Sequence, residues 1–511
     1  MSIVRLILLL CMAPVVRGAD RFAFFEPVQP PRPFQVMVHR GGTTQAPENT
    51  RSALTRCIED GFEWAEVDVR LTLDGKHLLS HGDRLSTGTD EAWRVSEHDL
   101  EELKTADVGS YFAPRFAGEP PLSLQECFDL CKGKLNLYLD CKRVNPEQLA
   151  QEILAAGMEH QTVVYDSPDN LRRIHEIARG KIALMTKWHS GFGIQSWVES
   201  NHLAAVEIDA PEITPETTRL FHDLGIKVQI KVLGGWDTHN FWNKGLQARA
   251  DWYQTDLPEE LLAHTLWGLL KKAPVRFSLH RGAGRYAPEN TLPAFEKALR
   301  LGAHLVEFDV RSTSDGMFYL LHDSTLDRCT SGTGPISNTP SSVIETLSAG
   351  IQFGRPFADT RMPTLETFLS DIEGKVDLYF DAKAISPEAL AEAVNRHHMA
   401  ERTVVYQSVP YLMRLKAIDP RIRTLPPLGS PGDVDPIAAR LNPYAFDVKW
   451  SILSKELIDR CHALGILVYS DALGEHERVG DYLQAMDWGI DVIQTDHPMR
   501  LLRAIELRSG E

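Results

Sequence analysis

The chain has 511 residues, of which 43% are hydrophobic and 24% are charged, as in ordinary globular proteins. Its formal net charge of −16 argues against generic nucleic-acid binding, which favours basic surfaces. The charge does not exclude an anionic substrate, because a bound cation can reverse the local field.

The first 19 residues have the pattern of a secretory signal peptide. Arg5 precedes the apolar run 6–16, and the small residues Gly18 and Ala19 follow it. The run is too short for a comfortable membrane span. We therefore expect export to the periplasm or the extracellular space, and no stable membrane span once the signal is removed. An uncleaved anchor or a buried helix is the alternative.

Six cysteines lie beyond this segment, and their spacings do not form a zinc pattern. Cys127, Cys131 and Cys141 would allow one disulfide in an oxidising compartment. Unpaired buried thiols are an equally good interpretation, so the sequence leaves the pairing open.

Short apolar strands alternate with helices after the proline-rich stretch 26–33. A helix is expected after Asn49, which can cap its N-terminus, and Gly61 is expected to end it. Only an Asp74-Gly75 turn separates the second strand from the third, which predicts a hairpin and a distorted barrel. The alternation of strands and helices along the rest of the unit predicts a parallel α/β barrel. The expected strands are 35–38, 64–69, 77–80, 135–139, 162–165, 182–185, 204–208 and 228–232, with helices such as 146–156 and 215–224 between several of them.

The second half of the chain repeats the polar residues of the first at a constant spacing of 241 positions (280 − 39, 307 − 66, 381 − 140). Many apolar residues between them have changed, which a shared core tolerates, but a core alone does not require matched charges. The repeat therefore indicates two units, expected at 34–264 and 275–506, each with a copy of one site. The matched segments are His39-Arg40-Gly41 with His280-Arg281-Gly282, Pro47-Glu48-Asn49-Thr50 with Pro288-Glu289-Asn290-Thr291, Glu66-Val67-Asp68 with Glu307-Phe308-Asp309, His81 with His322, and Asp140 and Lys142 with Asp381 and Lys383.

Three carboxylates in each unit form a candidate metal site. Alternate residues of a strand point to the same face, so Glu66 and Asp68 point together, as do Glu307 and Asp309. Two such acids repel each other unless a proton or a cation lies between them. A third oxygen from Asp140 or Asp381 favours a hard cation, either calcium or magnesium. A single Glu-x-Asp is more often a solvated strand edge, but two copies in register with His and Lys outweigh that alternative.

Histidines and cations accompany these acids. His39 and His81, like His280 and His322, suit general acid–base work near neutral pH, or are hydrogen-bonded structural histidines. The candidate phosphate ligands are Arg40, Lys142, Arg281 and Lys383, whose alternative is pairing with the neighbouring carboxylates. Together these groups indicate phosphoryl transfer with electrostatic stabilisation.

The ordered set of motifs resembles the glycerophosphodiester phosphodiesterase family over nearly all of both units. The resemblance implies two tandem TIM-type (β/α)8 barrels of the phospholipase C-like type. It also implies that small glycerophosphodiesters are hydrolysed to glycerol phosphate and an alcohol with a divalent cation. It assigns the acid–base role to His39, His81, His280 and His322, the metal to Glu66, Asp68, Asp140, Glu307, Asp309 and Asp381, and the phosphate to Arg40, Lys142, Arg281 and Lys383.

The two units depart from this pattern to different degrees. The family more often has Glu where Asp140 and Asp381 stand. The second unit has His322-Asp323 followed by Arg328, whereas the first has His81-Gly82 and Ser86 near the position of Arg328. The pattern is therefore more complete in the second unit.

A charge also reverses between the units near their last strands. Lys231 of the first unit aligns with Asp471 of the second, which predicts different substrates if both side chains point into the site.

Two other functions remain open. One is a phospholipase-type phosphodiesterase acting on lipid head groups, for which the sequence shows no clear apolar rim. The other is a first unit that has lost activity and serves as a binding or structural partner. The oligomeric state, the leaving alcohol and the attacking group are not determined by the sequence.

Overall fold

A computed structural model describes residues 21–89, 93–270 and 272–510. The signal peptide expected at 1–19 lies outside these residues. The chain divides into two compact units between Leu269 and Leu270.

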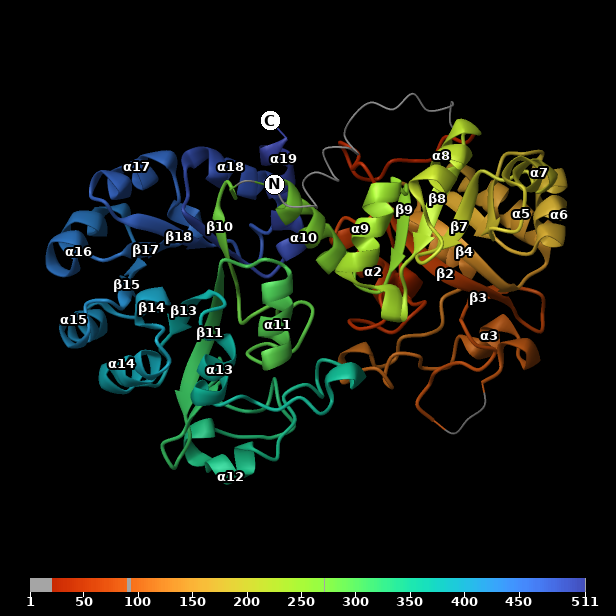
Figure 1. Ribbon diagram of the computed structural model, residues 1–511. Helices are drawn as coiled ribbons and strands as arrows, with labels where there is room; N and C mark the ends of the chain where they lie inside the picture. Colours follow the sequence, from red (N-terminus) through yellow and green to blue (C-terminus); the bar gives the residue numbers. More distant parts are fainter. Residues whose placement is uncertain (1–20, 90–92, 271, 511) are drawn as a thin grey trace. The chain divides into compact units, whose positions relative to one another are not determined.

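The first unit is a closed eight-stranded parallel barrel (Figure 1). The ring runs β1–β9–β8–β7–β6–β5–β4–β2, and pairing of β1 with β2 closes it. The expected strands are all present, within two residues at most of their ends except for β4, which extends further. The strands of the ring are β1 Gln35–Val38, β2 Trp64–Leu71, β4 Asn136–Arg143, β5 Thr162–Tyr165, β6 Ala183–Lys187, β7 Ala205–Asp209, β8 Lys227–Lys231 and β9 Trp252–Thr255, the last of which was not expected.

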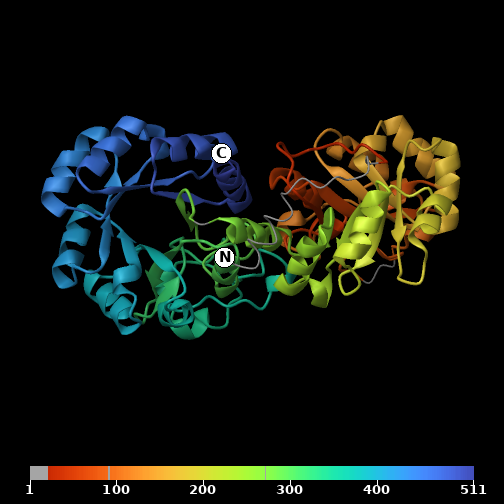
Figure 2. The ribbon, with the colours of Figure 1, turned by 45° about the horizontal axis from the view of Figure 1, so that its top comes forward.

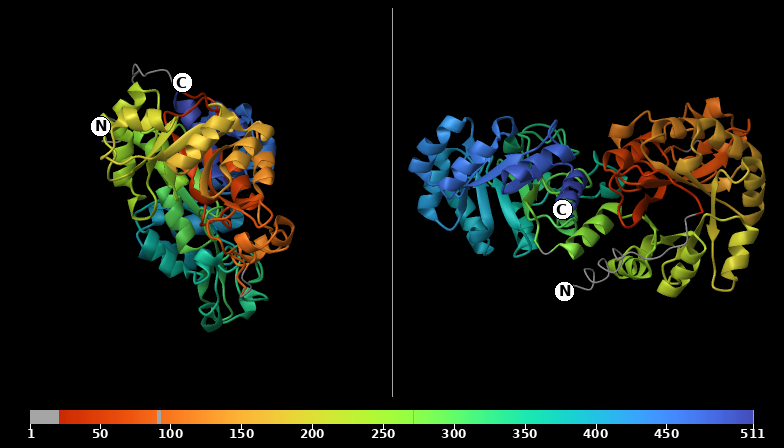
Figure 3. Two further views of the ribbon diagram at one scale, coloured as in Figure 1. Left: turned by 90° about the vertical axis from the view of Figure 1, so that its right-hand side faces the viewer. Right: turned by 90° about the horizontal axis from the view of Figure 1, so that it is seen from above.

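The expected hairpin is also present. β3 (His77–Leu79) pairs antiparallel with the end of β2, outside the ring, so the barrel departs from strict alternation. The helices of this unit lie outside its strands (Figure 3). They are α2 Arg51–Glu59, α3 Leu100–Leu103, α4 Leu124–Cys131, α5 Pro146–Ala156, α6 Pro168–Ala178, α7 Ile194–Ser200, α8 Pro215–Asp223, α9 His239–Ala248 and α10 Pro258–Leu269.

The cap of α2 corrects one sequence-based expectation. Thr50, not Asn49, is the N-cap, and its side chain accepts a hydrogen bond from the Ala53 N–H. Asn49 has a left-handed backbone (φ 60°), and its side chain bonds Asp68 instead. Gly61 follows the end of α2 with φ 69°, as expected for a residue that stops a helix.

The second unit repeats the barrel, with one break in the ring. Its order is β15–β14–β13–β11–β10–β19–β18–β17–β16, and β12 pairs antiparallel with β11. Pro426 separates β15 from β16 and, lacking an N–H, cannot continue the ladder. Two backbone bonds close the gap, from Tyr444 N to Thr424 O and from Asp447 N to Pro426 O. The strands are β10 Arg276–Leu279, β11 Leu305–Ser312, β12 Phe318–Leu320, β13 Asp377–Asp381, β14 Thr403–Tyr406, β15 Arg423–Leu425, β16 Pro427–Leu428, β17 Ala445–Val448, β18 Leu467–Asp471 and β19 Val492–Thr495.

Helices surround these strands as well (Figure 2). Several begin with a cap followed by proline, such as Ser386 before α14, because proline suits the first helical turn. The helices are α11 Leu292–Arg300, α12 Ser341–Ile344, α13 Leu365–Ile372, α14 Pro387–Arg396, α15 Val409–Ile418, α16 Val434–Leu441, α17 Lys455–Ala463, α18 Val479–Trp488 and α19 Pro498–Ser509.

A buried apolar layer fills the lower half of each barrel. Trp64, Tyr138 and Ala205 belong to this layer in the first unit, and Leu305 and Tyr379 belong to it in the second. Residues two positions later on the same strands face the same interior, one layer nearer the carboxyl ends. That upper layer carries the polar residues of the two sites.

Disulfides are absent among the described residues. All six cysteines beyond the leader are free thiols, and Cys127 and Cys131 are buried. The interpretation of unpaired thiols therefore holds for this structure.

Candidate active sites

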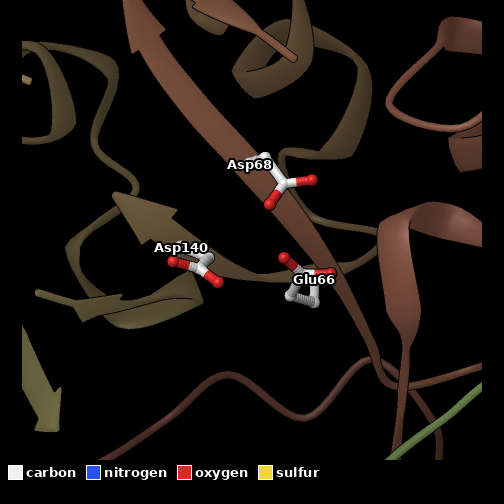
Figure 4. Close-up of side chains that lie close together, drawn as sticks. All are labelled: Glu66, Asp68 and Asp140. Carbon is white, nitrogen blue, oxygen red and sulfur yellow. The ribbon is translucent and has the colours of Figure 1, made fainter. Parts of the chain in front are cut away.

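Three carboxylates converge at the carboxyl end of the first barrel (Figure 4). Glu66 and Asp68 project from β2, and Asp140 lies opposite Asp68 in the register of β4. One oxygen of each residue lies within 4.8 Å of the others. Glu66 and Asp68 are each only 1% exposed, so their charges are held away from bulk water.

Backbone and amide groups orient these acids. Asn49 Nδ2 donates to Asp68 Oδ2 at 2.8 Å, and Asn49 Oδ1 accepts from the Asp68 N–H at 2.9 Å. The N–H of Arg40 donates to Glu66 Oε2 at 2.9 Å. Arg40 adopts φ 51° in the turn after β1, which points its N–H at that carboxylate.

Two cations border the cluster. Lys142 Nζ lies 2.7 Å from Asp140 and 3.2 Å from Asp68. Arg40 Nε lies 3.4 Å from Asp68, while its Nη1 donates to Glu48 at 2.9 Å. Pairing with the carboxylates, the alternative role considered for these cations, therefore occurs, and it also places both beside the cluster.

One histidine has a fixed orientation at this cluster. His39 Nδ1 donates to Asp256 Oδ1 at 2.8 Å, which leaves Nε2 as the nitrogen turned toward the acids, 3.9 Å from Glu66 Oε2. His81 borders a cavity of about 30 Å³ that is also lined by Glu48 and Tyr111. Burial lowers the pKa of His81.

The second unit reproduces the arrangement. Glu307, Asp309 and Asp381 form the matching cluster within 4.8 Å. The matched bonds are Asn290 Nδ2 to Asp309 at 2.9 Å, Arg281 N to Glu307 at 2.7 Å, His280 Nδ1 to Asp496 at 2.9 Å and Lys383 Nζ to Asp381 at 2.5 Å. The acids, the two cations and the first histidine of the second unit are therefore arranged as in the first.

A family model matches both units. The model of the glycerophosphoryl diester phosphodiesterase family matches residues 39–178 and 280–500, more than half of the chain. The chain belongs to this family. Its members are phosphoric diester hydrolases, and the chain is an enzyme of that class.

Individual relatives match one unit's length. The glycerophosphodiester phosphodiesterase of Caldanaerobacter subterraneus subsp. tengcongensis is 32% identical over 240 residues, 44% of this chain and 96% of that protein. The enzyme of that name from Bacillus subtilis is 25% identical over 244 residues, 43% of this chain and 82% of its own. A crystal structure of a glycerophosphodiester phosphodiesterase from Agrobacterium tumefaciens is 29% identical, with a TM-score of 0.42, and covers 45% of this chain and 99% of its own.

The phosphodiesterase sites differ around the second histidine. In the second unit His322 Nδ1 donates to Asp323 at 2.8 Å, and Arg328 bonds both Asp323 and Glu289. Glu289 also accepts from Arg281. Burial alone would raise the pKa of Glu289, but Arg328 and Arg281 lower it to about 2. The network thus links His322, through Asp323, Arg328 and Glu289, to Arg281 of the His-Arg-Gly motif.

The first unit lacks this network. Gly82 follows His81 where Asp323 follows His322. The nearby Asp83 instead accepts from the backbone and the hydroxyl of Ser96. The small cavity beside His81 is lined by Glu48 and Ser86. Glu48 matches Glu289 of the second unit, and Ser86 lies near the position of Arg328.

The clusters are electrostatically unfavourable without a positive ion. Burial, followed by the charges of Asp68 and Asp140, raises the pKa of Glu66 well above its usual range. Burial, Asp309 and Asp381 do the same to the pKa of Glu307. Asp309 Oδ1 is buried and accepts no hydrogen bond. A cation would relieve both conditions, and carboxylate oxygens are the ligands that hard divalent ions prefer.

The residues that orient the site were not predicted in that role. Glu48 was named only within a repeated motif and Asn49 within that motif and as a helix cap, while Asp256 and Asp496 end the Gln-Thr-Asp segments of the two units. Asp237 and Glu477 in turn accept from the backbone N–H of these two aspartates at 2.7 Å. The repetition of Gln-Thr-Asp at the last strand was the available signal for them.

Among residues 21–89, 93–270 and 272–510, no helix is both long enough and apolar enough to cross a bilayer.

Proposed function

We propose that the chain hydrolyses glycerophosphodiesters to glycerol 3-phosphate and an alcohol, at sites that hold a divalent cation. The observation that carries this proposal is the duplicated cluster of three acids, with a histidine whose Nδ1 is bonded to an aspartate beside it. The names of the relatives support the substrate class.

The acids would hold calcium or magnesium. Glu66, Asp68 and Asp140 offer three oxygens to one ion, and Glu307, Asp309 and Asp381 offer three to another. A bound divalent ion supplies Lewis-acid stabilisation of negative charge on the phosphoryl oxygens. The donor set contains oxygen alone, which suits either ion and does not distinguish them.

The cations would bind the phosphodiester. Arg40 and Lys142 in the first unit, and Arg281 and Lys383 in the second, present N–H groups beside the acids. Each cation contacts carboxylates that a metal ion would neutralise, so its N–H groups would become available to the phosphate oxygens.

The histidines would move the protons. His39 Nδ1 is held by Asp256 and its Nε2 lies toward Glu66, and His280 Nδ1 is held by Asp496 in the same way. We assign one proton transfer to Nε2 of His39 or His280 and the other to His81 or His322. One histidine removes the proton of the attacking group, and the other protonates the leaving alcohol.

The two sites are not equal in this proposal. His322 is oriented by Asp323, whereas His81 has no aspartate after it. We propose that the second site turns over faster and that the first is slower or serves as a binding partner.

The decisive experiment follows glycerol 3-phosphate release from glycerophosphocholine by the full chain, with calcium, with magnesium and with chelator. Glu66→Ala/Asp68→Ala and Glu307→Ala/Asp309→Ala inactivate one site each. Glu212→Ala/Glu216→Ala removes two exposed charges from the first unit as a matched control. Chelator-sensitive release that falls mainly in the second variant supports the proposal, and comparable loss in both means two equal sites. Absence of release with either ion contradicts it and favours a lipid head group or a binding role.

We also propose that the chain is exported. The charged residue, apolar run and small residues within 1–19 support this. Mass analysis of the exported protein tests it, since a cleaved chain begins near residue 20. Retention of the full chain inside the cell would contradict the proposal.

A further inference from the structure

The barrel walls opposite the two metal clusters differ in charge. Lys231 and Asp471 are the last residues of β8 and β18, and each is in register with the matching glutamine, Gln254 or Gln494. The two residues therefore occupy the same position in their barrels. The reversal seen in sequence is a reversal at one structural position.

These residues face the barrel interior. Asp447 and Asp471 follow the interior residues Ala445 and Tyr469 by two positions. Asp381 of the metal cluster follows Tyr379 in the same way. The three acids thus share the upper interior layer of the second barrel, on different strands.

The first unit neutralises the acids of this wall internally. Lys187 Nζ lies 2.7 Å from Asp209, and Lys231 Nζ lies 3.8 Å from Glu207. Both lysines end strands of the barrel, β6 and β8. A substrate at this site therefore meets paired charges on the wall opposite the cluster.

The second unit leaves its acids without a lysine partner, and the positive charge that acts on Asp471 is that of His280. Pro427, opposite Asp447 in the register, stands where Lys187 lies opposite Glu207. Oδ1 of Asp447 and Oδ1 of Asp471 are both buried without a hydrogen-bond partner. In the described residues, no Lys, Arg or His nitrogen lies within 4.0 Å of either carboxylate. Lys449, which replaces Asp209, is exposed.

A second metal ion does not explain these two acids. A three-ligand cluster in the second unit joins Glu307, Asp309 and Asp381, and it does not include Asp447 or Asp471. Two unpaired carboxylates on an interior wall instead match an organic cation, which brings one positive charge and needs no complete ligand shell.

Resting on the proposed function, we propose that Asp447 and Asp471 bind a positively charged ammonium group on the leaving alcohol, as in choline esters. The second site would thus select cationic glycerophosphodiesters. The first site, whose wall is neutralised by Lys187 and Lys231, does not share this preference. The tyrosine pair Tyr138–Tyr165 of the first unit is matched by Tyr379–Tyr406 in the second, so this pair does not account for the difference.

The test compares glycerophosphocholine with glycerophosphoglycerol, whose leaving alcohol is neutral. Glu66→Ala/Asp68→Ala leaves the second site in the full chain, and Glu307→Ala/Asp309→Ala leaves the first. The ratio of kcat/KM for the choline ester to that for the glycerol ester is expected to be about tenfold higher at the second site. In the Glu66→Ala/Asp68→Ala background, where only the second site works, Asp447→Asn/Asp471→Asn is expected to lower this ratio by about tenfold or more.

A matched control removes two charges from exposed helix positions of the same unit. Asp371→Asn/Glu392→Gln is expected to preserve the ratio. Equal ratios at the two sites, or a ratio unchanged by Asp447→Asn/Asp471→Asn, would overturn the inference while leaving the proposed hydrolysis intact.

Binding keeps the inference testable if neither ester is hydrolysed, the result that removes the proposed function. Calorimetry with choline itself then compares the unaltered chain with Asp447→Asn/Asp471→Asn. Binding that weakens about tenfold in the variant supports the inference, and equal or absent binding in both overturns it.

Discussion

Asn49 holds Asp68 through two hydrogen bonds, one to the carboxylate and one from the backbone N–H. Asn290 and Asp309 repeat both bonds, at 2.9 and 3.2 Å. Asn49 and Asn290 therefore each orient a predicted metal ligand without being predicted ligands themselves. Partners of this kind fix the geometry of a metal site.

Replacing Asn290 is expected to weaken binding of the divalent cation at the second site. Asn290→Ala leaves Asp309 free to turn, so the cation concentration for half-maximal second-site activity should rise about 10- to 100-fold. Asn145→Ala is the control, because the side chain of Asn145 caps α5 by accepting from the backbone N–H groups of Glu147 and Gln148. Metal titrations of chains with the first site inactivated measure the effect. An unchanged requirement in Asn290→Ala would remove the role given to Asn290.

Stability in chelator should fall as pH rises. The folded-state pKa values of Glu66 and Glu307 lie above the ordinary value, so above pH 4.5 these two groups bind more protons in the folded chain than in the unfolded chain. This contribution is fully present below the unfolded pKa and is lost as pH rises through the folded pKa. The Tm in chelator should therefore decline from pH 5 upward, and calcium or magnesium should restore more stability at pH 8 than at pH 5.

The matched variant isolates these two acids. Glu66→Gln/Glu307→Gln cannot ionise at either position, so its Tm in chelator should decline less over the same range. Thermal unfolding at several pH values makes the comparison. An identical decline in the variant would assign the effect to other buried acids, such as Asp237, whose pKa is raised to about 6 by burial.

Asp323 should govern turnover at the second site. Asp323→Asn removes the carboxylate that accepts from His322 Nδ1, so kcat should fall at least about tenfold while KM changes less. Asp83→Asn is the matched change in the first unit, where the side chain bonds Ser96 instead, and it should leave first-site kcat nearly unchanged. Each variant is measured with the other site inactivated. Equal losses from both variants would show that Asp323 has no special role.

Arg328 should be irreplaceable by lysine. Its guanidinium bonds Glu289 with two nitrogens and Asp323 with two contacts, which a single ammonium cannot reproduce. Arg328→Lys should therefore lower second-site kcat nearly as much as Arg328→Met. Because the side chain is 47% exposed, its loss should cost only about 1 kcal/mol of stability or less. Full activity in Arg328→Lys would mean that charge alone suffices.

Local patterns predicted the strands and the carboxylates, and long-range contacts account for what they missed. Glu66 and Asp68 are two apart on one strand, so their common direction follows from strand geometry alone. Asn49 and Thr50 are both good caps, and only the fold places Asp68 where Asn49 can bond it. His39 and Asp256 are 217 positions apart and meet because β1 pairs with β9.

The strand break in the second barrel likewise could not be interpreted from local sequence patterns. The sequence contains two consecutive prolines, Pro426 and Pro427, which interrupt a ladder wherever they fall. Only the strand pairing shows that Pro427 lies opposite Asp447 of β17, so that the position of Lys187 is taken by a residue without charge. The charge reversal between Lys231 and Asp471 could likewise be interpreted only from the strand register, which places each residue on the interior wall of its own barrel.

Gly350 should be the more sensitive of two glycines in the second unit. A Cβ added there would lie 1.9 Å from the carbonyl oxygen of Phe357, so the turn must open. Gly350→Ala should cost about 3 kcal/mol, the upper end for overpacking. Gly374 has φ 72° with open space around it, so Gly374→Ala should cost only about 1 kcal/mol of backbone strain. Thermal unfolding of both variants decides, and a Tm loss in Gly350→Ala no larger than in Gly374→Ala would mean that the turn adapts.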